Sequence, residues 1–425
     1  MDTGLQSDII AAVDGGFDAQ VKLTADLIAI PSLRGQEATA QDFMAENYHR
    51  RGLAVDCWRI DVADIQHLPG FSPVAIPYDN AFNVVGIHRP RQTTGRSLIL
   101  NGHIDVVPTG PLDLWTKPPF SPWIEGDWLY GRGSGDMKAG LVASLAAFDA
   151  LDQLGYRPAA EVYLQSVIEE ECTGNGALAC LQRGYRAKAA LIPEPMQETC
   201  MTAQLGVMWF QVKVRGKPTH VGHAGQGANA IEACFPIIRA LHALESEWNK
   251  SRHPIWHDHS HPINFVVSKI EGGDWTSSVP AWCTFDMRIS FYPGQSLAEV
   301  RGAVETAVRN AAAGDTFLAN NPPKVVYHGF QAEPYVVDKA NEIHAVLGQS
   351  HLQAFGEALL GKPATATTDA RFFGLYADIP ALVYGPKSED YHGFDERVSL
   401  TSLRKITRTI ALFIATWCGL EKTAR

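Results

Sequence analysis

Histidine and carboxylate side chains at the ends of short apolar segments are the residues of this chain best suited to chemistry. The first group is Gly102-His103-Ile104-Asp105, which follows the apolar segment 97–100. In an extended chain, residues two apart point to the same side, so His103 and Asp105 can act together. An imidazole that binds a divalent metal commonly donates its other N–H to a carboxylate. The pair is therefore a candidate ligand with an orienting carboxylate, although a lone histidine in a strand is more often a satisfied core residue.

A second candidate ligand, Asp136, lies between a glycine-rich segment, 131–135, and a segment of helical composition, 137–148. Glycines permit backbone angles that other residues rarely adopt, so they can hold Asp136 in an unusual position at the start of the helix. The alternative for this residue considered alone is an ordinary N-cap.

Three adjacent glutamates follow a predicted strand over 161–168, and a fourth carboxylate follows a predicted strand over 189–192. They are Glu169, Glu170, Glu171 and Glu194. Adjacent like charges repel one another, and a divalent cation would stabilise them, whereas the simpler alternative is a solvated acidic turn. Neighbours on an extended chain point in opposite directions, so one of a pair can bind metal while the other faces a reacting water. Ligands of open α/β sheets gather at the carboxyl ends of strands, where these side chains lie.

The segments around these residues predict an α/β fold with a sheet covered on both faces, because strand and helix patterns alternate. Helical spacing covers 17–52 with a break at Pro31, and a loop rich in proline and tryptophan, 111–123, lies between the first two candidate ligands. The loop either borders the site or is an ordered surface loop held by its own aromatic residues. Further strands are predicted at 55–60, 83–87, 206–214, 264–270 and 281–290, with a helix at 228–244.

Composition restricts the class of protein. The 425 residues carry a formal net charge of −10, which has the wrong sign for binding nucleic acid or an anionic membrane surface. No apolar run is long enough to cross a membrane, and the first residues lack the pattern of a secretory signal. Seven scattered cysteines without a CxxC pair argue against a disulfide framework. We therefore expect a cytoplasmic protein.

Six motifs in this order resemble a known family over nearly the whole chain: GHIDVVP, GRGSGDMKAG, IEEECTGNG, LIPEP, GKPTHVGHAGQGANAI and YHGFDERV. The family is that of the dinuclear metallopeptidases, which includes acetylornithine deacetylase, succinyl-diaminopimelate desuccinylase, aminoacylase and the glutamate carboxypeptidases. The resemblance implies a mostly parallel sheet between helices, interrupted by an inserted two-layer α/β lid used for dimerisation. It divides the chain into a catalytic domain of residues 1–204 and 332–425 and a lid of residues 205–331.

The resemblance also implies a role for each motif residue. One divalent ion would be held by His103, Asp136 and Glu194, and the other by Asp136, Glu171 and His392. Asp105 would orient His103, and Glu170 would be the general base. This mixed nitrogen and oxygen ligand set suits zinc first, with manganese or cobalt as alternatives.

Three lid residues are expected to contact substrate, again by resemblance. His220 would cross a homodimer interface to polarise the scissile carbonyl, and Arg288 would bind a substrate carboxylate. Ser278 stands in Ser277-Ser278-Val279-Pro280, where relatives often have an asparagine, and Gly385-Pro386-Lys387 also departs from the family pattern. These departures leave the substrate open. The histidine-rich segment 252–261 is expected to be a solvated loop.

The predicted reaction is hydrolysis of an amide C–N bond in a small molecule, with an N-acyl amino acid or related amide as substrate. Alternatives are a dipeptide or carboxypeptidase substrate, a carbamoyl compound or an amino-substituted aromatic ring. An alternative of another class is a catalytically silent dimeric binding protein. The resemblance further implies a cis peptide bond between Asp136 and Met137.

Overall fold

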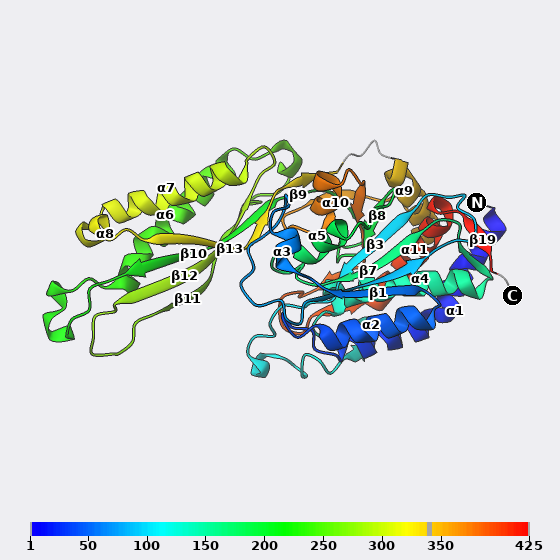
Figure 1. Cartoon of the computed structure of the whole chain (residues 1–425), viewed down its shortest axis with the longest axis horizontal. Helices are drawn as coiled ribbons and strands as arrows, with labels where there is room; N and C mark the ends of the chain where they lie inside the picture. Colours follow the sequence, from blue (N-terminus) through cyan, green and yellow to red (C-terminus); the bar gives the residue numbers. More distant parts are fainter. Residues whose placement is uncertain (1, 338–341, 424–425) are drawn as a thin grey trace.

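The computed structural model describes residues 2–337 and 342–423, which form two parts lying end to end (Figure 1). The larger part is built around a six-stranded sheet, and the smaller part is a layer of four strands and two long helices. The predicted α/β fold with an inserted lid is confirmed. The domain limits given above stay a prediction.

The central sheet consists of β1 Ala54–Arg59, β2 Phe82–His88, β3 Leu98–His103, β7 Val162–Val167, β8 Ala190–Ile192 and β16 Ala381–Val383. Its order is β1-β2-β7-β3-β8-β16, and the last four strands are parallel neighbours. Only β2 runs against its neighbours in this sheet as described. The residues that follow β7, β3 and β8 therefore meet at one edge of the sheet.

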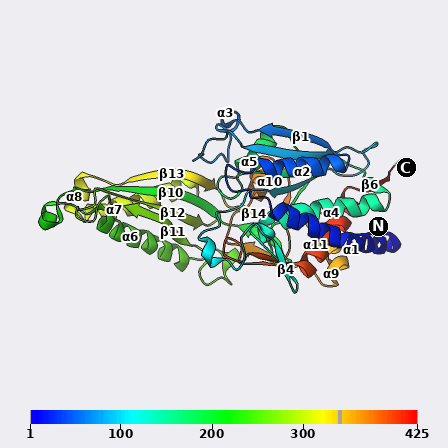
Figure 2. The same ribbon diagram turned by 90° about the horizontal axis from the view of Figure 1, so that it is seen from below.

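Helices cover both faces of this sheet. One face is covered by α1 Thr3–Ile28, α2 Ala38–Arg50, α4 Ala139–Gln153 and α11 Leu400–Trp417, and the other by α5 Asn175–Gln182 and α10 Ala370–Tyr376. Figure 2 shows α1, α4 and α11 packed together, and α9 Glu342–Phe355 lies against α11. Two strand glycines allow the close approach on the first face. A Cβ on Gly86 would lie 2.7 Å from Tyr48 of α2, and one on Gly102 would lie 2.8 Å from Leu141 of α4.

The lid is an antiparallel sheet with helices on one face. Its strands are β10 Gly206–Arg215, β11 Phe265–Gly272, β12 Trp282–Phe291 and β13 Lys324–Ala332, in the order β11-β12-β10-β13. Its long helices are α6 Ala230–Lys250 and α7 Leu297–Ala313, followed by the short α8 Thr316–Asn320. Alternate residues of β10, such as Phe210 and Val212, are buried in one core with Ile237 of α6 and Val300 of α7. The lid thus has a core of its own.

Smaller sheets join the two parts and complete the larger one. A four-stranded sheet in the order β17-β18-β5-β4 is made of β4 Trp123–Glu125, β5 Trp128–Tyr130, β17 Ser388–Glu389 and β18 Arg397–Ser399. The others contain β9 Cys200–Gln204, β14 Tyr335–Val336 and β15 Gly361–Ala364, and β6 Tyr156–Pro158 with β19 Leu420–Lys422. A one-turn helix, α3 Val62–Ile65, follows β1.

Helix limits are where the structure differs most from the sequence expectations. The break at Pro31 is confirmed, but α1 begins at Thr3 and not near Phe17. Ile9 and Val13 extend its buried stripe towards the N-terminus, so the Gly15-Gly16 pair does not end the helix. Within the described ranges, no helix combines the length and apolar character needed to cross a membrane.

Candidate metal centre

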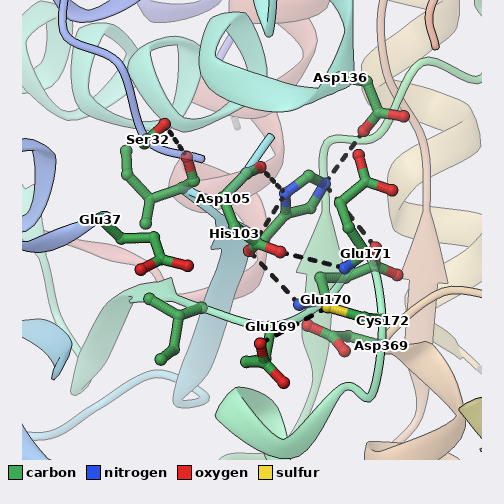
Figure 3. Close-up of polar contacts among 12 residues, drawn as sticks. Ser32, Glu37, His103, Asp105, Asp136, Glu169, Glu170, Glu171, Cys172 and Asp369 are labelled. Carbon is green, nitrogen blue, oxygen red and sulfur yellow. Dashed lines mark hydrogen bonds and ion pairs between the residues drawn. The ribbon is translucent and has the colours of Figure 1, made fainter. Parts of the chain in front are cut away.

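Three neighbouring parallel strands supply half of the centre. His103 is the last residue of β3, Glu170 and Glu171 follow β7, and Glu194 follows β8. The order β7-β3-β8 places His103 between the acidic segments, as the strand-end argument predicts. All but Glu171 are less than a tenth exposed. Figure 3 shows His103, Glu170 and Glu171 grouped together.

The small four-stranded sheet supplies the other half, so not every candidate ligand follows a strand of the central sheet. Asp136 follows no strand of the central sheet: it lies in the turn Ser134–Lys138 beyond β5, and His392 lies between β17 and β18. Asp136 is also not an N-cap, because α4 begins at Ala139 and no side-chain cap is present there. The expected cis bond between Asp136 and Met137 is present.

Asp136 lies between the two histidines. Its Oδ1 is 3.0 Å from Nε2 of His103, and its Oδ2 is 3.4 Å from Nε2 of His392. His392 Nε2 also lies 3.0 Å from Glu171 Oε2. One carboxylate thus presents a different oxygen to each imidazole, which is the arrangement of a ligand shared by two ions.

Glu194 and Glu170 complete the cluster on the His103 side. Their oxygens lie 3.6 Å and 3.9 Å from Nε2 of His103. Two groups of ligand atoms in the described part of the chain are compact enough for an ion, within 4.8 Å of one another: His103 with Asp136 and Glu171, and His103 with Glu170 and Glu194. Six residues from distant segments therefore converge.

The charges of the centre fit a divalent cation. Burial raises the pKa of Glu194 to about 8 and raises that of Glu170 well above its usual value. The charge of Glu171 raises the pKa of His392 to about 11, and Glu194 raises that of His103 although burial opposes this. A metal ion displaces protons from carboxylates and imidazoles alike, so it would replace these tightly held protons.

His103 contacts Asp105 chiefly through the backbone. The carbonyl oxygen of Asp105 lies 2.9 Å from Nδ1 of His103, whereas its nearer carboxylate oxygen is 3.6 Å away. The carboxylate instead accepts hydrogen bonds from the backbone N–H groups of Glu170 and Glu171, at 3.3 Å and 3.1 Å (Figure 3). Asp105 therefore links the β3 end to the acidic turn.

Two of the predicted lid residues lie together, and the third lies elsewhere. His220 forms an isolated bridge with Ser278, and its Nδ1 accepts a hydrogen bond from the backbone of Gly222. Both residues lie in loops beyond the ends of β10 and β11, at the tip of the lid that is far from the catalytic part (Figure 1). Arg288 lies near the opposite end of β12, with Nη2 donating to the carbonyl of Thr365 at 3.5 Å.

The loop at 111–123 and the histidine segment have structural explanations. Trp115 is buried, donates from Nε1 to the carbonyl of Thr109, and lies edge-on to Phe394; Trp123 stacks on Tyr130. These tryptophans therefore pack the loop. In the histidine segment, Arg252 donates to backbone carbonyls and most residues are exposed, but Trp256 is fully buried and donates from Nε1 to the carbonyl of Ala364.

Sequence reasoning missed two ion pairs beside the ligands, of which the second is fully buried. Arg34 binds Glu169, and Arg132 binds Glu396. Arg132 and Glu396 stand inside the motifs GRGSGD and YHGFDERV, so their positions beside Asp136 and His392 were visible. Their pairing was not, because 264 residues separate them.

Comparison with known proteins agrees with this geometry. A profile described as peptidase family M20/M25/M40 matches residues 99–416. N-formyl-4-amino-5-aminomethyl-2-methylpyrimidine deformylase of Halalkalibacterium halodurans is 28% identical over 440 residues, covering 98% of each chain. Succinyl-diaminopimelate desuccinylase of Methylorubrum extorquens is 28% identical over 409 residues, covering 91% of this chain and 95% of the relative.

Solved structures show the same fold. A dipeptidase of Saccharomyces cerevisiae matches with a TM-score of 0.79 at 14% identity, covering 97% of this chain and 98% of the other. Human carnosine dipeptidase 1 matches with a TM-score of 0.75 at 15% identity, covering 97% of this chain and 99% of the other.

Proposed function

The chain belongs to peptidase family M20/M25/M40 and is a metal-dependent amide hydrolase, and we propose that it removes an acyl group from the nitrogen of a small molecule. The observation that carries this proposal is the position of Asp136, whose two oxygens face His103 and His392. A shared carboxylate between two imidazole-containing ligand sets suits a pair of divalent ions.

The proposed ligands are His103, Asp136 and Glu194 for one ion and Asp136, Glu171 and His392 for the other. Their imidazole and carboxylate donors suit zinc, with manganese or cobalt as alternatives. Bound ions would supply Lewis acidity towards the amide carbonyl and lower the pKa of water.

Glu170 is the proposed general base. It is buried beside His103, with a carboxylate oxygen 3.9 Å from Nε2 of that residue, where a carboxylate can take up a proton and pass it on. Its carboxylate accepts a proton from the water that attacks the carbonyl carbon. The C–N bond then breaks, and Glu170 donates this proton to the leaving nitrogen. The products are a carboxylic acid and an amine. Asp105 keeps His103 and the acidic turn in position through the contacts described above.

The lid residues are proposed to act within a homodimer. His220 lies beyond the far end of β10, a ten-residue strand that spans about 30 Å at 3.3 Å per residue. It is therefore too distant to reach the metal centre of its own chain, and a second copy is the proposed route by which it polarises the carbonyl. Ser278 lies beside it and is a proposed substrate contact. Arg288, half-buried at the other end of the lid, is the proposed ligand of a substrate carboxylate.

The names of the relatives favour acyl removal over peptide cleavage. One relative is named for removing a formyl group and another for removing a succinyl group, and both resemble this chain over nine-tenths or more of its length. The dipeptidases share the fold at identities too low to assign a substrate. An N-acyl amine, including an N-acyl amino acid, is thus the proposed substrate. A formylated aminomethyl group on a heteroaromatic ring is the specific alternative that the deformylase favours.

A cytoplasmic location is also proposed. All seven cysteines are unpaired in the structure, six of them buried, as expected in a reducing compartment.

The test is a substrate panel assayed with zinc-loaded and manganese-loaded protein. It contains N-formyl, N-acetyl, N-succinyl and N-carbamoyl derivatives of amino acids and of aminomethyl heteroaromatics, with dipeptides as the comparison. We expect amine release from at least one N-acyl compound at a higher kcat/KM than from any dipeptide. Preferential cleavage of dipeptides would reject the acyl proposal while leaving the hydrolase assignment in place.

A further inference from the structure

The buried Arg132–Glu396 pair connects the segments that present Asp136 and His392. Its side chains are 2% and 1% exposed, and Arg132 Nη1 donates to Glu396 Oε2 at 2.6 Å. Arg132 belongs to the turn before Asp136, and Glu396 belongs to the loop after His392. Neither side chain is among the proposed ligands.

The Glu396 carboxylate is saturated by donors from the turn that carries Asp136. Oε2 also accepts from the backbone N–H of Gly133 at 2.9 Å, while Oε1 accepts from Gly135 at 2.9 Å and from Asp136 itself at 3.0 Å. The backbone of Glu396 adds to this: its carbonyl accepts from Gly131 N at 2.9 Å and from Ser134 Oγ at 3.1 Å.

The glycines of this turn make the arrangement possible. Gly133 has φ +82°, in the left-handed region, and a Cβ there would lie 2.7 Å from Val106. A Cβ on Gly135 would lie 2.8 Å from Ser388. The turn can therefore enclose the Glu396 carboxylate only with glycine at 133 and 135. Through these hydrogen bonds, Glu396 fixes the backbone orientation of Asp136.

The other end of the pair fixes the loop of His392. Arg132 Nη2 donates to the carbonyl of Gly393 at 2.9 Å, directly after His392, and lies 3.4 Å from the carbonyl of Pro108. His392 itself adopts φ +62°, a backbone conformation that a non-glycine residue keeps only when its surroundings impose it.

We propose that Arg132 and Glu396 are positioning residues. They hold Asp136 and His392 at the distance and orientation needed to bind the ion on the His392 side. This rests on the proposed two-ion site. The pair acts on Asp136 through one hydrogen bond to its backbone and on His392 through the neighbouring carbonyl. The ion held by His103 and Glu194 depends on the pair only through Asp136, so it is affected less.

The test is zinc binding by metal-free protein, measured with buffered zinc and competing chelators. In Glu396→Gln the amide nitrogen cannot accept the backbone hydrogen bonds. We expect the ion on the His392 side, identified as the one that His392→Ala loses, to lose about 10- to 100-fold in affinity, the range for residues that support metal ligands. The ion on the His103 side should change less. The zinc affinities of Glu396→Gln are then compared with those of His392→Ala, a variant that lacks a ligand of the same ion.

A double variant separates positioning from general destabilisation. If the pair acts through His392, Glu396→Gln added to His392→Ala should change zinc binding by much less than it does alone. Asp127→Asn is the matched control, because Asp127 also accepts from a backbone N–H and from the hydroxyl groups of Ser399 and Thr401 beside β18. It should keep both ions at wild-type affinity.

Folded Glu396→Gln protein that binds both ions as the wild type does would overturn the proposal, as would equal weakening of both ions. If Glu396→Gln fails to fold by circular dichroism, Arg132→Lys replaces it. Lysine keeps the charge but has a single nitrogen and cannot span Glu396 and Gly393, so a folded variant with unchanged binding of both ions would overturn the proposal equally. A wild-type chain that binds fewer than two ions would instead contradict the proposed function.

Discussion

Arg34 binds the carboxylate of Glu169 through two guanidinium nitrogens, with Nη2 2.8 Å from Oε2. Tyr78 and Thr173 donate to the same carboxylate at 2.7 Å and 3.0 Å. Glu169 is therefore fully engaged away from His103, and of the three adjacent glutamates only Glu170 and Glu171 face the centre. This relationship favours Glu170 and Glu171 over Glu169 for the roles proposed above.

Glu170→Gln should lower kcat by about 10²- to 10⁴-fold, because the amide cannot accept the proton of the attacking water. Both ions should remain bound, since Glu170 is not one of their proposed ligands. The measurement is turnover on the best amide of the panel together with metal content.

Glu169→Gln is the comparison within the same turn. It should mainly lower the free energy of unfolding, by about 2 kcal/mol for a lost charged hydrogen bond. The assignment of the base is wrong if Glu169→Gln abolishes turnover and Glu170→Gln does not.

Asp136→Asn should release both ions under conditions in which His392→Ala releases one. The reason is that Asp136 is the only proposed ligand shared by the two sets, whereas His392 belongs to one. Metal content after dialysis against a weak chelator distinguishes them. An Asp136→Asn protein that keeps one ion at wild-type affinity would show that the carboxylate is not shared.

Glu37 makes the stability of the metal-free protein depend on pH. It is 1% exposed, accepts from Gly35 N at 2.9 Å through Oε1, and has no partner for Oε2 among the described residues. Burial raises its pKa from 4.5 to about 7. The folded form holds this proton more tightly than the unfolded form, so stability falls as pH rises from about 4.5 to about 7.

The loss is about 3 kcal/mol at 1.36 kcal/mol per pKa unit. The free energy of unfolding in urea should be measured for the wild type and for Glu37→Gln across this pH range. The change with pH should differ between them by that amount and should be smaller for Glu37→Gln. Glu46→Gln, at an exposed glutamate of α2, the helix that follows Glu37, should follow the wild type. Parallel curves for the wild type and Glu37→Gln would exclude the effect.

Mixing two inactive variants tests the shared site. His220→Ala and Glu170→Gln homodimers should each be nearly inactive. After subunit exchange, about a quarter of wild-type activity should return, because half of random dimers are mixed and each has one complete site. If each chain uses its own His220, the mixture will be no more active than its parts.

Much of the fold, and the grouping of the candidate ligands, could be predicted because strand ends and motif order are local features. The ends of β3, β7 and β8 were visible as apolar segments followed by His103, Glu170 and Glu194. Asp136 and His392 were correctly grouped by resemblance, but their shared small sheet was not predicted, since its strands have only two or three residues.

Pairings between distant residues were beyond sequence reasoning. Nothing in the pattern around Arg34 indicates that it binds Glu169, and the helix predicted from residue 17 begins at Thr3, where Ile9 and Val13 are buried in the core. In both cases tertiary contacts outweigh the local signal.

Titration of the metal-free protein with zinc, with bound ions and amide hydrolysis measured in the same samples, tests the central claim most directly. We predict that hydrolysis of an N-acyl amine rises with zinc and reaches its plateau at two ions per chain. Full activity at one ion per chain, or a chain holding two ions that hydrolyses no amide of the panel, would contradict the account.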